Sequence, residues 1–359
     1  MKRRSVIFIA AGLVLPVLLM GLFALLNAEQ AIMDGWVHGV MAPVEQFLGR
    51  LWSIFPFSVA EVLCVLVLGL ALVWLASALV CLIRRRWHGL FRRVLWLTSL
   101  VLWLLAGLDW MWNASYYASD FTQRSGLVCR VHSVEELEAV TADFARKASE
   151  LACQVERDEQ GHFALSKPEC IARGVHVYDR LVEEYAFLDI PCVKAKPLMC
   201  SRLQSILGFT GIYFPFTGEA NVNVDAPACL LPATIAHEMA HQRMVAAEEE
   251  ANFVGIAACV TGEDVTFAYS GYLMGLIHLS NALYRADPQR WYAISETLGP
   301  ELLVDWQDNR AYWDALASPV EETAGEVYDA FLKGNEQELG MRSYGACVDL
   351  LVTWWLDRA

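Results

Sequence analysis

Long uncharged apolar segments in the first third of the chain constrain its fold more than any other feature of the sequence. Val6–Leu26 has 21 residues without a charged side chain, and Val62–Ile83 has 22. A helix of about 20 such residues, rising about 1.5 Å per residue, crosses the hydrocarbon core of a bilayer. A third run, Val94–Leu108, is shorter, but Trp110 and Trp112 follow it and suit the headgroup level. The sequence therefore predicts three transmembrane helices near residues 6–26, 62–83 and 94–112.

An alternative interpretation of the first run is the core of a cleaved signal peptide, because Lys2, Arg3 and Arg4 precede it. Such a core usually has about 7 to 15 residues and is followed by a small-x-small cleavage site. The run here is longer, and no such site follows it. A retained anchor is the preferred interpretation.

Basic residues beside a membrane span stay in the cytoplasm, so their positions predict the orientation of the chain. They cluster at residues 2–4 and again at 84–86 and 92–93, whereas Asn27–Glu61 carries four acidic residues and a single arginine. We therefore expect a multi-pass protein of the plasma membrane with its N-terminus in the cytoplasm. Residues 1–112 form the membrane anchor, and residues 113–359 form an extracytoplasmic domain.

The charge of the predicted outer domain limits its partners. Residues 113–359 contain 18 basic and 36 acidic side chains, a net charge of −18. Nucleic acid is excluded as an expected partner, because it binds to clustered basic surfaces. The lipid bilayer and a peptide or protein substrate remain as expected partners. Eight of the ten cysteines lie in this domain, an even number that is compatible with disulfides outside the cytoplasm.

Hydrophobic periodicity predicts a mainly α-helical outer domain with a small sheet. Ser133 and Glu136 match a capping box, which predicts a helix from there to about residue 157. A second helix is expected over 169–187, and a small sheet between residues 190 and 227, where prolines punctuate short β-prone runs. Helices then continue almost to the end, with breaks near Gly262, Pro288, Pro300 and Pro319. The apolar run 347–356 is too short to span a membrane and predicts a core helix.

The sequence His237-Glu238-Met239-Ala240-His241 is an HExxH motif in one of these predicted helices. Side chains four residues apart share a helix face, so both imidazoles can bind one metal ion. Zinc lowers the pKa of a bound water to about 7, and Glu238 can take the proton of that water. The motif therefore predicts a Zn²⁺ site with Glu238 as the general base.

A catalytic zinc site has three protein ligands, so a third ligand is needed. The run Glu248-Glu249-Glu250 begins seven residues after His241 and opens an apolar helix. Antiparallel pairing about the intervening turn places Glu248 level with His241, and Asn252 one turn later. We expect Glu248 to be the third ligand and Asn252 to support an imidazole. Glu250 is the alternative ligand, and His278 is a more distant one.

Several segments together resemble an uncharacterised bacterial family of membrane-anchored HExxH proteins, a domain of unknown function. They are residues 215–223, 237–243 and 248–253, the ending at 328–333 and 343–351, and the three apolar runs. Glu248-x-x-Ala-Asn252 also resembles the Glu-x-x-Ala-Asp element of the gluzincin peptidases, with Asn in place of Asp. Met244 stands where the family usually has Gly. The resemblance implies a zincin-like metallopeptidase domain of α+β type, with Glu248 as the third zinc ligand.

Two further elements are candidate parts of the site. Residues 220–224 are positioned to form an edge strand on which Asn221 and Asn223 meet a substrate backbone by strand addition, although an ordinary hairpin explains the pattern equally well. Tyr269 and Tyr272 begin the next helix, and either hydroxyl can stabilise an oxyanion. The alternative for both tyrosines is a place in the core.

The leading hypothesis is a membrane-anchored zinc-dependent metallopeptidase that hydrolyses peptide bonds. Its rival is a non-catalytic metal-binding sensor or scaffold on a peptidase fold. The intact Glu238 favours the enzyme, because a structural zinc site does not need a general base.

Overall fold

The computed structural model describes residues 10–334 and 344–358, and these residues form two compact units. The first unit holds the chain up to Val44 together with Val59–Ser119, and the second holds Glu45–Ser58 together with the chain from Asp120 onward. The boundary therefore falls seven residues after the predicted one at Trp112. A short segment of the predicted anchor, residues 45–58, also belongs to the second unit.

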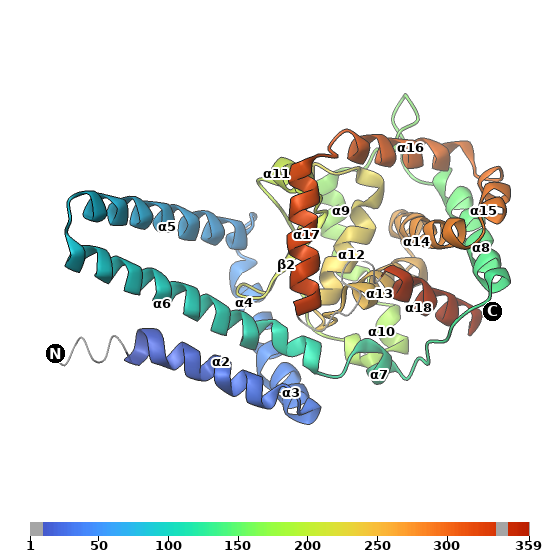
Figure 1. The fold of residues 1–359 in the computed structure, drawn as a ribbon. Helices are drawn as coiled ribbons and strands as arrows, with labels where there is room; N and C mark the ends of the chain where they lie inside the picture. The colour runs from blue at the N-terminus through green and yellow to red at the C-terminus, as the bar shows by residue number, and fades with distance from the viewer. Residues whose placement is uncertain (1–9, 335–343, 359) are drawn as a thin grey trace. The chain divides into compact units, whose positions relative to one another are not determined.

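The first unit is built from apolar helices. Two of its helical segments, Val59–Ile83 and Trp87–Tyr117, are the described ones that are long and apolar enough to cross a membrane. In Figure 1 they appear as the antiparallel pair α5 and α6. The predicted spans 62–83 and 94–112 fall within them. The predicted span 6–26 lies partly outside the described residues, and its described part is a shorter apolar helix, Ala11–Leu26. The helices of this unit are α2 (Leu15–Leu26), α3 (Gln30–Trp36), α5 (Val59–Ile83) and α6 (Trp87–Met111).

Tryptophans attach α2 to α6 within the first unit. The Trp110 indole donates a hydrogen bond to the Leu19 carbonyl (3.1 Å), and its ring meets Phe23 edge-on at 5.6 Å. Trp103 donates likewise to the Ala11 carbonyl (3.2 Å). These bonds satisfy indole N–H groups inside an otherwise apolar helix packing.

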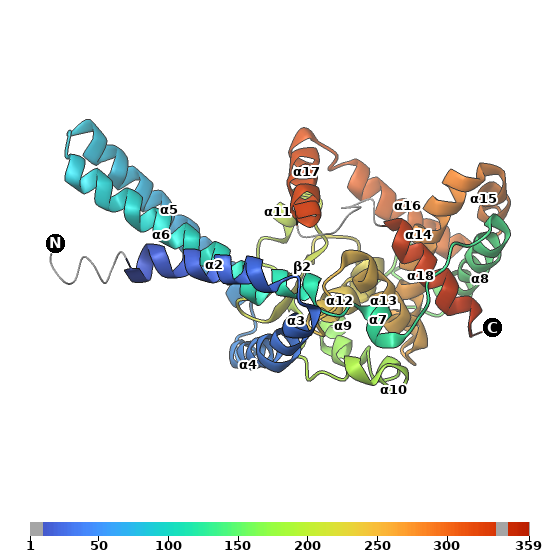
Figure 2. The same ribbon diagram turned by 60° about the horizontal axis from the view of Figure 1, so that its bottom comes forward.

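The second unit is mainly helical, as predicted, and Figure 2 shows its helices from a second direction. The capping box of Ser133 and Glu136 is confirmed, although the helix it opens ends at Ala152. The single helix predicted over 169–187 is wrong, because short turns interrupt it. The helices of this unit are α4 (Ala42–Trp52, from Glu45 on), α7 (Phe121–Ser125), α8 (Val134–Ala152), α9 (Lys167–Arg173), α10 (Leu181–Glu184), α11 (Ser201–Ile206), α12 (Leu231–His241), α13 (Glu248–Thr261), α14 (Val265–Ala286), α15 (Pro288–Ser295), α16 (Pro300–Asp314), α17 (Pro319–Gly334) and α18 (Tyr344–Leu356).

The core of the second unit lies where α13 packs between α12 and α14. Helix α18, which contains the predicted core segment, covers α13 with Trp354, and that ring meets Phe253 edge-on. The helix breaks predicted at Gly262 and at the three prolines are confirmed, because α13 ends just before Gly262 and α15, α16 and α17 each begin at a proline. All ten cysteines are free thiols in this structure, and four of them are buried in the core: Cys170, Cys229, Cys259 and Cys347.

A small sheet precedes the HExxH helix, as predicted. Its strands are β1 (Lys196–Pro197), β2 (Gly211–Phe214) and β3 (Glu219–Val222), in the order β1-β3-β2. Strand β3 pairs in parallel with β1 and antiparallel with β2. The prediction that residues 220–224 form an edge strand is therefore wrong. In this order β3 is the central strand, and β2, its hairpin partner, lies at an edge of the sheet.

Helix α4 packs against the rest of the second unit through a close contact between Gly49 and Gly218. A Cβ on Gly49 would lie 2.9 Å from the Gly218 carbonyl oxygen, and a Cβ on Gly218 would lie 2.1 Å from the Glu45 carbonyl oxygen. Gly218 also has a positive φ of 64°. Beside this contact the buried Lys196 ammonium donates to the Trp52 carbonyl at 2.7 Å and pairs with Glu219. Residues 45–52 are thus an integral part of the folded unit.

Candidate metal centre

Helix α12 holds the two histidines of the HExxH motif on one face. Pro232 occupies its first turn, where a missing N–H costs no hydrogen bond. A Cβ on Gly255 of α13 would lie 2.9 Å from the His237 backbone nitrogen, so only glycine allows α13 to approach α12 this closely. The close approach brings the start of α13 to the two imidazoles.

The turn between α12 and α13 orients His241. Met244 adopts the left-handed conformation with φ of 61°, a region that glycine enters far more readily than other residues. This turn places the Val245 carbonyl 2.7 Å from Nδ1 of His241. Because a carbonyl only accepts, Nδ1 carries the proton and Nε2 keeps a lone pair. That tautomer is the one that suits metal binding through Nε2.

Three side chains converge into a group that could hold a metal ion. One ligand atom each from His237, His241 and Glu248 lies within 4.8 Å of the other two. Nε2 of His237 is 3.4 Å from one Glu248 carboxylate oxygen, and Nε2 of His241 is 3.7 Å from the other. Ligands about 2.1 Å from a tetrahedral ion are about 3.4 Å apart, so these separations fit a zinc-sized cation. The structure brings together the three residues predicted as ligands.

Burial and mutual charge set the ionisation of the three groups. Burial lowers the pKa of His241 to about 4, so the ring is neutral at pH 7. Burial acts to raise the pKa of Glu248, but the two histidines outweigh it and hold the pKa at about 2. Burial also opposes the charged form of His237, but Glu248 raises its pKa overall. A neutral imidazole and an ionised carboxylate are the forms that bind metal.

Glu238 is buried near this group, and the charges of His237 and Glu248 act on its carboxyl, although it is not one of the three ligand residues. Its Oε2 has no hydrogen-bond partner among the described residues, and burial raises its pKa to about 8. A Cβ on Gly211 would lie 2.3 Å from Oε1 of Glu238, so strand β2 passes directly against the carboxylate. A buried carboxylate with an unused oxygen is suited to hold and exchange a proton.

Asn252 and His278 lie near His237, as the spacing of α13 predicts for Asn252. The Asn252 side chain raises the pKa of His237, although the buried Nδ1 of His237 makes no hydrogen bond of standard geometry within the described residues. His278 comes from α14. Burial lowers its pKa to about 4, with His237 contributing. His278 is outside the group of three that could hold a metal.

Glu250, the alternative ligand, points to a different part of the unit. Its carboxylate accepts hydrogen bonds from the backbone amides of Phe121 (2.9 Å) and Thr122 (3.1 Å) at the start of α7. Burial raises its pKa to about 8. Glu250 therefore attaches the start of α7 to α13.

Glu248→Gln and Glu250→Gln should separate these two roles. Glu248→Gln removes a charged ligand and should lower zinc affinity by more than the 10- to 100-fold that is typical of partners outside the coordination sphere. Glu250→Gln should keep zinc affinity within about threefold and lower the free energy of unfolding by about 1–3 kcal/mol, because one amide loses its acceptor. Zinc titration and thermal melting of the full chain measure both effects. Loss of zinc in Glu250→Gln alone would contradict the assignment.

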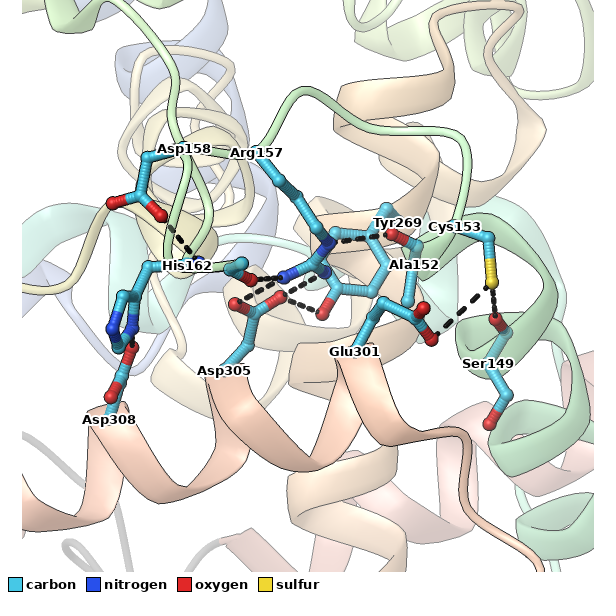
Figure 3. A network of polar contacts seen from close by, with 11 residues as sticks. Ser149, Ala152, Cys153, Arg157, Asp158, His162, Tyr269, Glu301, Asp305 and Asp308 are labelled. Atoms are coloured by element: carbon cyan, nitrogen blue, oxygen red, sulfur yellow. Dashed lines mark hydrogen bonds and ion pairs between the residues drawn. The ribbon is translucent and has the colours of Figure 1, made fainter.

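The two tyrosines predicted as catalytic lie elsewhere, and this prediction is corrected. Tyr269 is fully buried, and its hydroxyl donates to Asp305, which also forms a two-pronged ion pair with Arg157 (3.1 and 2.8 Å; Figure 3). Tyr272 packs edge-on against Phe144 and Trp355. Both tyrosine rings pack in the core, because the face of α14 that carries them lies against α8 and α16.

Tyr269→Phe should therefore lower stability without changing the metal centre. Removing the hydroxyl takes one hydrogen bond from the buried Asp305, a loss of about 1–3 kcal/mol in the free energy of unfolding. Zinc affinity should be unchanged. Thermal melting and zinc titration of the full chain test this, and a drop in zinc affinity with normal melting would restore Tyr269 to the site.

The remaining candidates from the sequence also have structural partners. The Asn221 amide donates to the Glu219 (3.0 Å) and Ile212 (3.3 Å) carbonyls, and the Asn223 amide donates to the Phe209 carbonyl (2.9 Å). Both side chains are buried, Asn221 within β3 and Asn223 directly after it, so these hydrogen bonds stabilise the strand hairpin.

Tyr328 is a site residue that sequence reasoning missed. It lies on α17, and its hydroxyl donates to a carboxylate oxygen of Glu248. Its ring meets Phe209 edge-on at 5.4 Å. Nothing in the local sequence signals this contact, because it depends on how α17 packs 80 residues after Glu248.

The fold and the site define a mainly helical protein with a three-residue group that could hold a metal ion and with helices that could cross a membrane. The chain belongs to the family described as protein of unknown function (DUF3810), whose model matches residues 36–352. Neither a curated protein nor a solved structure matches the chain.

Proposed function

We propose that this protein is a membrane-anchored zinc-dependent peptidase. The observation that carries the proposal is the buried Glu238 carboxylate beside the group of His237, His241 and Glu248. One oxygen of this carboxylate, Oε2, accepts no hydrogen bond from any described residue. A structural metal site gains nothing from such a group, whereas hydrolysis requires a proton acceptor next to the metal. The presence of Glu238 next to the three candidate ligands supports catalysis rather than simple metal storage.

Each residue of the site has a distinct role in this proposal. His237, His241 and Glu248 would hold zinc, which when bound supplies a water acidic enough to ionise near pH 7. Glu238 takes the proton and passes it to the leaving amine, a transfer for which a pKa near neutrality is suited. The Val245 carbonyl holds His241 in the required tautomer. The Tyr328 hydroxyl donates to the Glu248 carboxylate and would hold this ligand in place.

The division of the chain into two units supports a proposed placement of the site relative to the membrane. Glu45–Ser58 precedes α5 and Asp120 follows α6, yet both belong to the second unit. A hairpin of two spans returns the chain to the side it left, which suits this arrangement. Arginines 84–86 lie at the turn between α5 and α6, and basic loops stay in the cytoplasm. We place the second unit outside the cytoplasm, with the N-terminus inside.

A reporter fused after Ala359 tests this placement. Alkaline phosphatase should be active and a fluorescent protein dark, because the first folds outside the cytoplasm and the second inside. A fluorescent, phosphatase-negative fusion would contradict the orientation.

Cleavage of a peptide library by the full chain in lipid nanodiscs tests the activity. We expect cleavage that a chelator abolishes and added zinc restores. A chain that binds zinc tightly but cleaves no peptide would instead support the metal-binding sensor.

A further inference from the structure

An apolar groove runs between α17 and the segment that leads into β2. Leu207 and Phe209 line one wall, and Val320, Val327 and Phe331 line the other. Its volume is about 860 Å³, within the range of sites that bind small molecules or side chains. The exposed fractions of Val320 and Val327 are 56% and 66%, so this wall offers apolar surface to an incoming group.

Tyr328 connects the groove to the candidate metal centre. Tyr328 lines it with its ring while its hydroxyl donates to Glu248. Phe209, which contacts that ring, lies two residues before Gly211, and Gly211 is the residue that touches Glu238. A ligand in the groove therefore contacts the ring whose hydroxyl donates to Glu248, and it also contacts the segment that leads into the strand beside Glu238.

Strand β2 gives this arrangement the form of a peptide site. It is at the edge of the sheet, and an extended peptide can add to an edge strand by backbone pairing. Alternate side chains of such a peptide point to the same face, so one of them can enter an adjacent groove.

Charge favours a peptide over lipid as the occupant. Glu321 and Glu322 lie in the first turn of α17, and the sequence after Trp112 carries a net charge of −18. Acidic groups around the groove repel the phosphates of lipid headgroups.

We propose that the groove binds a large apolar side chain of an extended peptide substrate, adjacent to the bond that is cleaved. The proposal rests on the proposed function and adds the substrate class: peptides with a bulky apolar residue beside the cleavage point. Burying a Phe side chain rather than Ala should improve binding by about 10- to 100-fold.

Binding to the full chain carrying Glu238→Gln, in nanodiscs with zinc, tests this without turnover. The probes are two fluorescent eight-residue peptides of Gly and Ser, one with a central Phe and one with Ala at that position. The Phe peptide should bind about 10- to 100-fold more tightly. Val327→Glu should abolish this preference, since it places a charge on the wall of the groove. Val131→Glu, which alters a valine that is 91% exposed and outside the groove, should retain it.

Equal binding of the two peptides, or a preference that survives Val327→Glu, would overturn the groove assignment. A photoreactive benzoylphenylalanine at position 327 identifies the occupant. Crosslinking to the Phe peptide supports the proposal, whereas crosslinking to lipid or to a second copy that the peptide does not reduce overturns it. Phe-selective binding without cleavage by the unsubstituted chain would refute the peptidase and leave the groove standing. Cleavage without side-chain preference would refute the groove alone.

Discussion

Replacing Glu238 by Gln is expected to lower the rate of peptide cleavage by at least about a hundredfold while zinc stays bound. The carboxylate is buried and outside the group of ligand atoms, so its loss removes proton transfer and leaves coordination intact. Gln has nearly the same shape as Glu, so the substitution changes the charge and the acid-base chemistry while keeping the packing. The measurements are kcat/KM on a cleaved peptide and zinc content of the same preparation.

Glu169→Gln is a matched control, because it neutralises an exposed acid in the first turn of α9. It should keep both activity and zinc. If Glu238→Gln also retains activity, with contaminating proteases excluded by chelator treatment, the proposed mechanism is wrong.

Gly218→Ala is expected to lower the free energy of unfolding of the second unit by at least about 3 kcal/mol. The new Cβ would lie 2.1 Å from the Glu45 backbone oxygen, and the positive φ of Gly218 is itself unfavourable for Ala. The two costs add, because helix α4 must move away from the new Cβ and the backbone at residue 218 must also leave its positive φ. Thermal melting of the full chain in nanodiscs should show a lowered transition.

Gly325→Ala is the control, since a Cβ at Gly325 of α17 meets no atom within 4 Å. It should melt at or slightly above the temperature of the unsubstituted chain, because Ala favours helix over Gly. Equal melting of Gly218→Ala and Gly325→Ala would mean that α4 does not pack on this unit.

The docking of α4 connects the segment before α5 to the metal centre. The Tyr213 hydroxyl donates to Glu45, and the Tyr213 ring lies 6.3 Å from the His241 ring, centroid to centroid. Burial raises the pKa of Glu45 well above its usual value, against the opposing effect of that hydrogen bond. Burial therefore favours the protonated form of this carboxyl beside the tyrosine.

Features of the site that depend on local spacing could be predicted from the sequence. Two histidines four residues apart share one face of α12, and Glu248 and Asn252 share one face of α13. The short connection between the two helices is therefore enough to bring these two faces together. The helix breaks at prolines were predictable for the same local reason. The left-handed conformation of Met244 in the turn between α12 and α13 was not predicted, because a methionine does not signal a positive φ.

Features that depend on distant packing could not be predicted. Tyr269, Tyr272 and Tyr328 are all aromatic residues on helices, and the structure places only Tyr328 at the ligands. The order of strands β1-β3-β2 is a property of the sheet and is not contained in the alternation of residues 220–224. Residues 45–58 lack a pattern that distinguishes an outer loop from a piece of the second unit, because two glycines and one buried carboxyl carry that contact.

The metal content of the purified full chain tests the central claim most directly. Elemental analysis of protein produced with zinc in the medium should find about one zinc per chain, and His241→Ala should contain almost none, since it loses one of three ligands. Tyr269→Phe, altered in the core, should contain as much zinc as the unsubstituted chain. An unsubstituted chain without zinc, or His241→Ala with a full equivalent, would contradict the metal centre described for His237, His241 and Glu248.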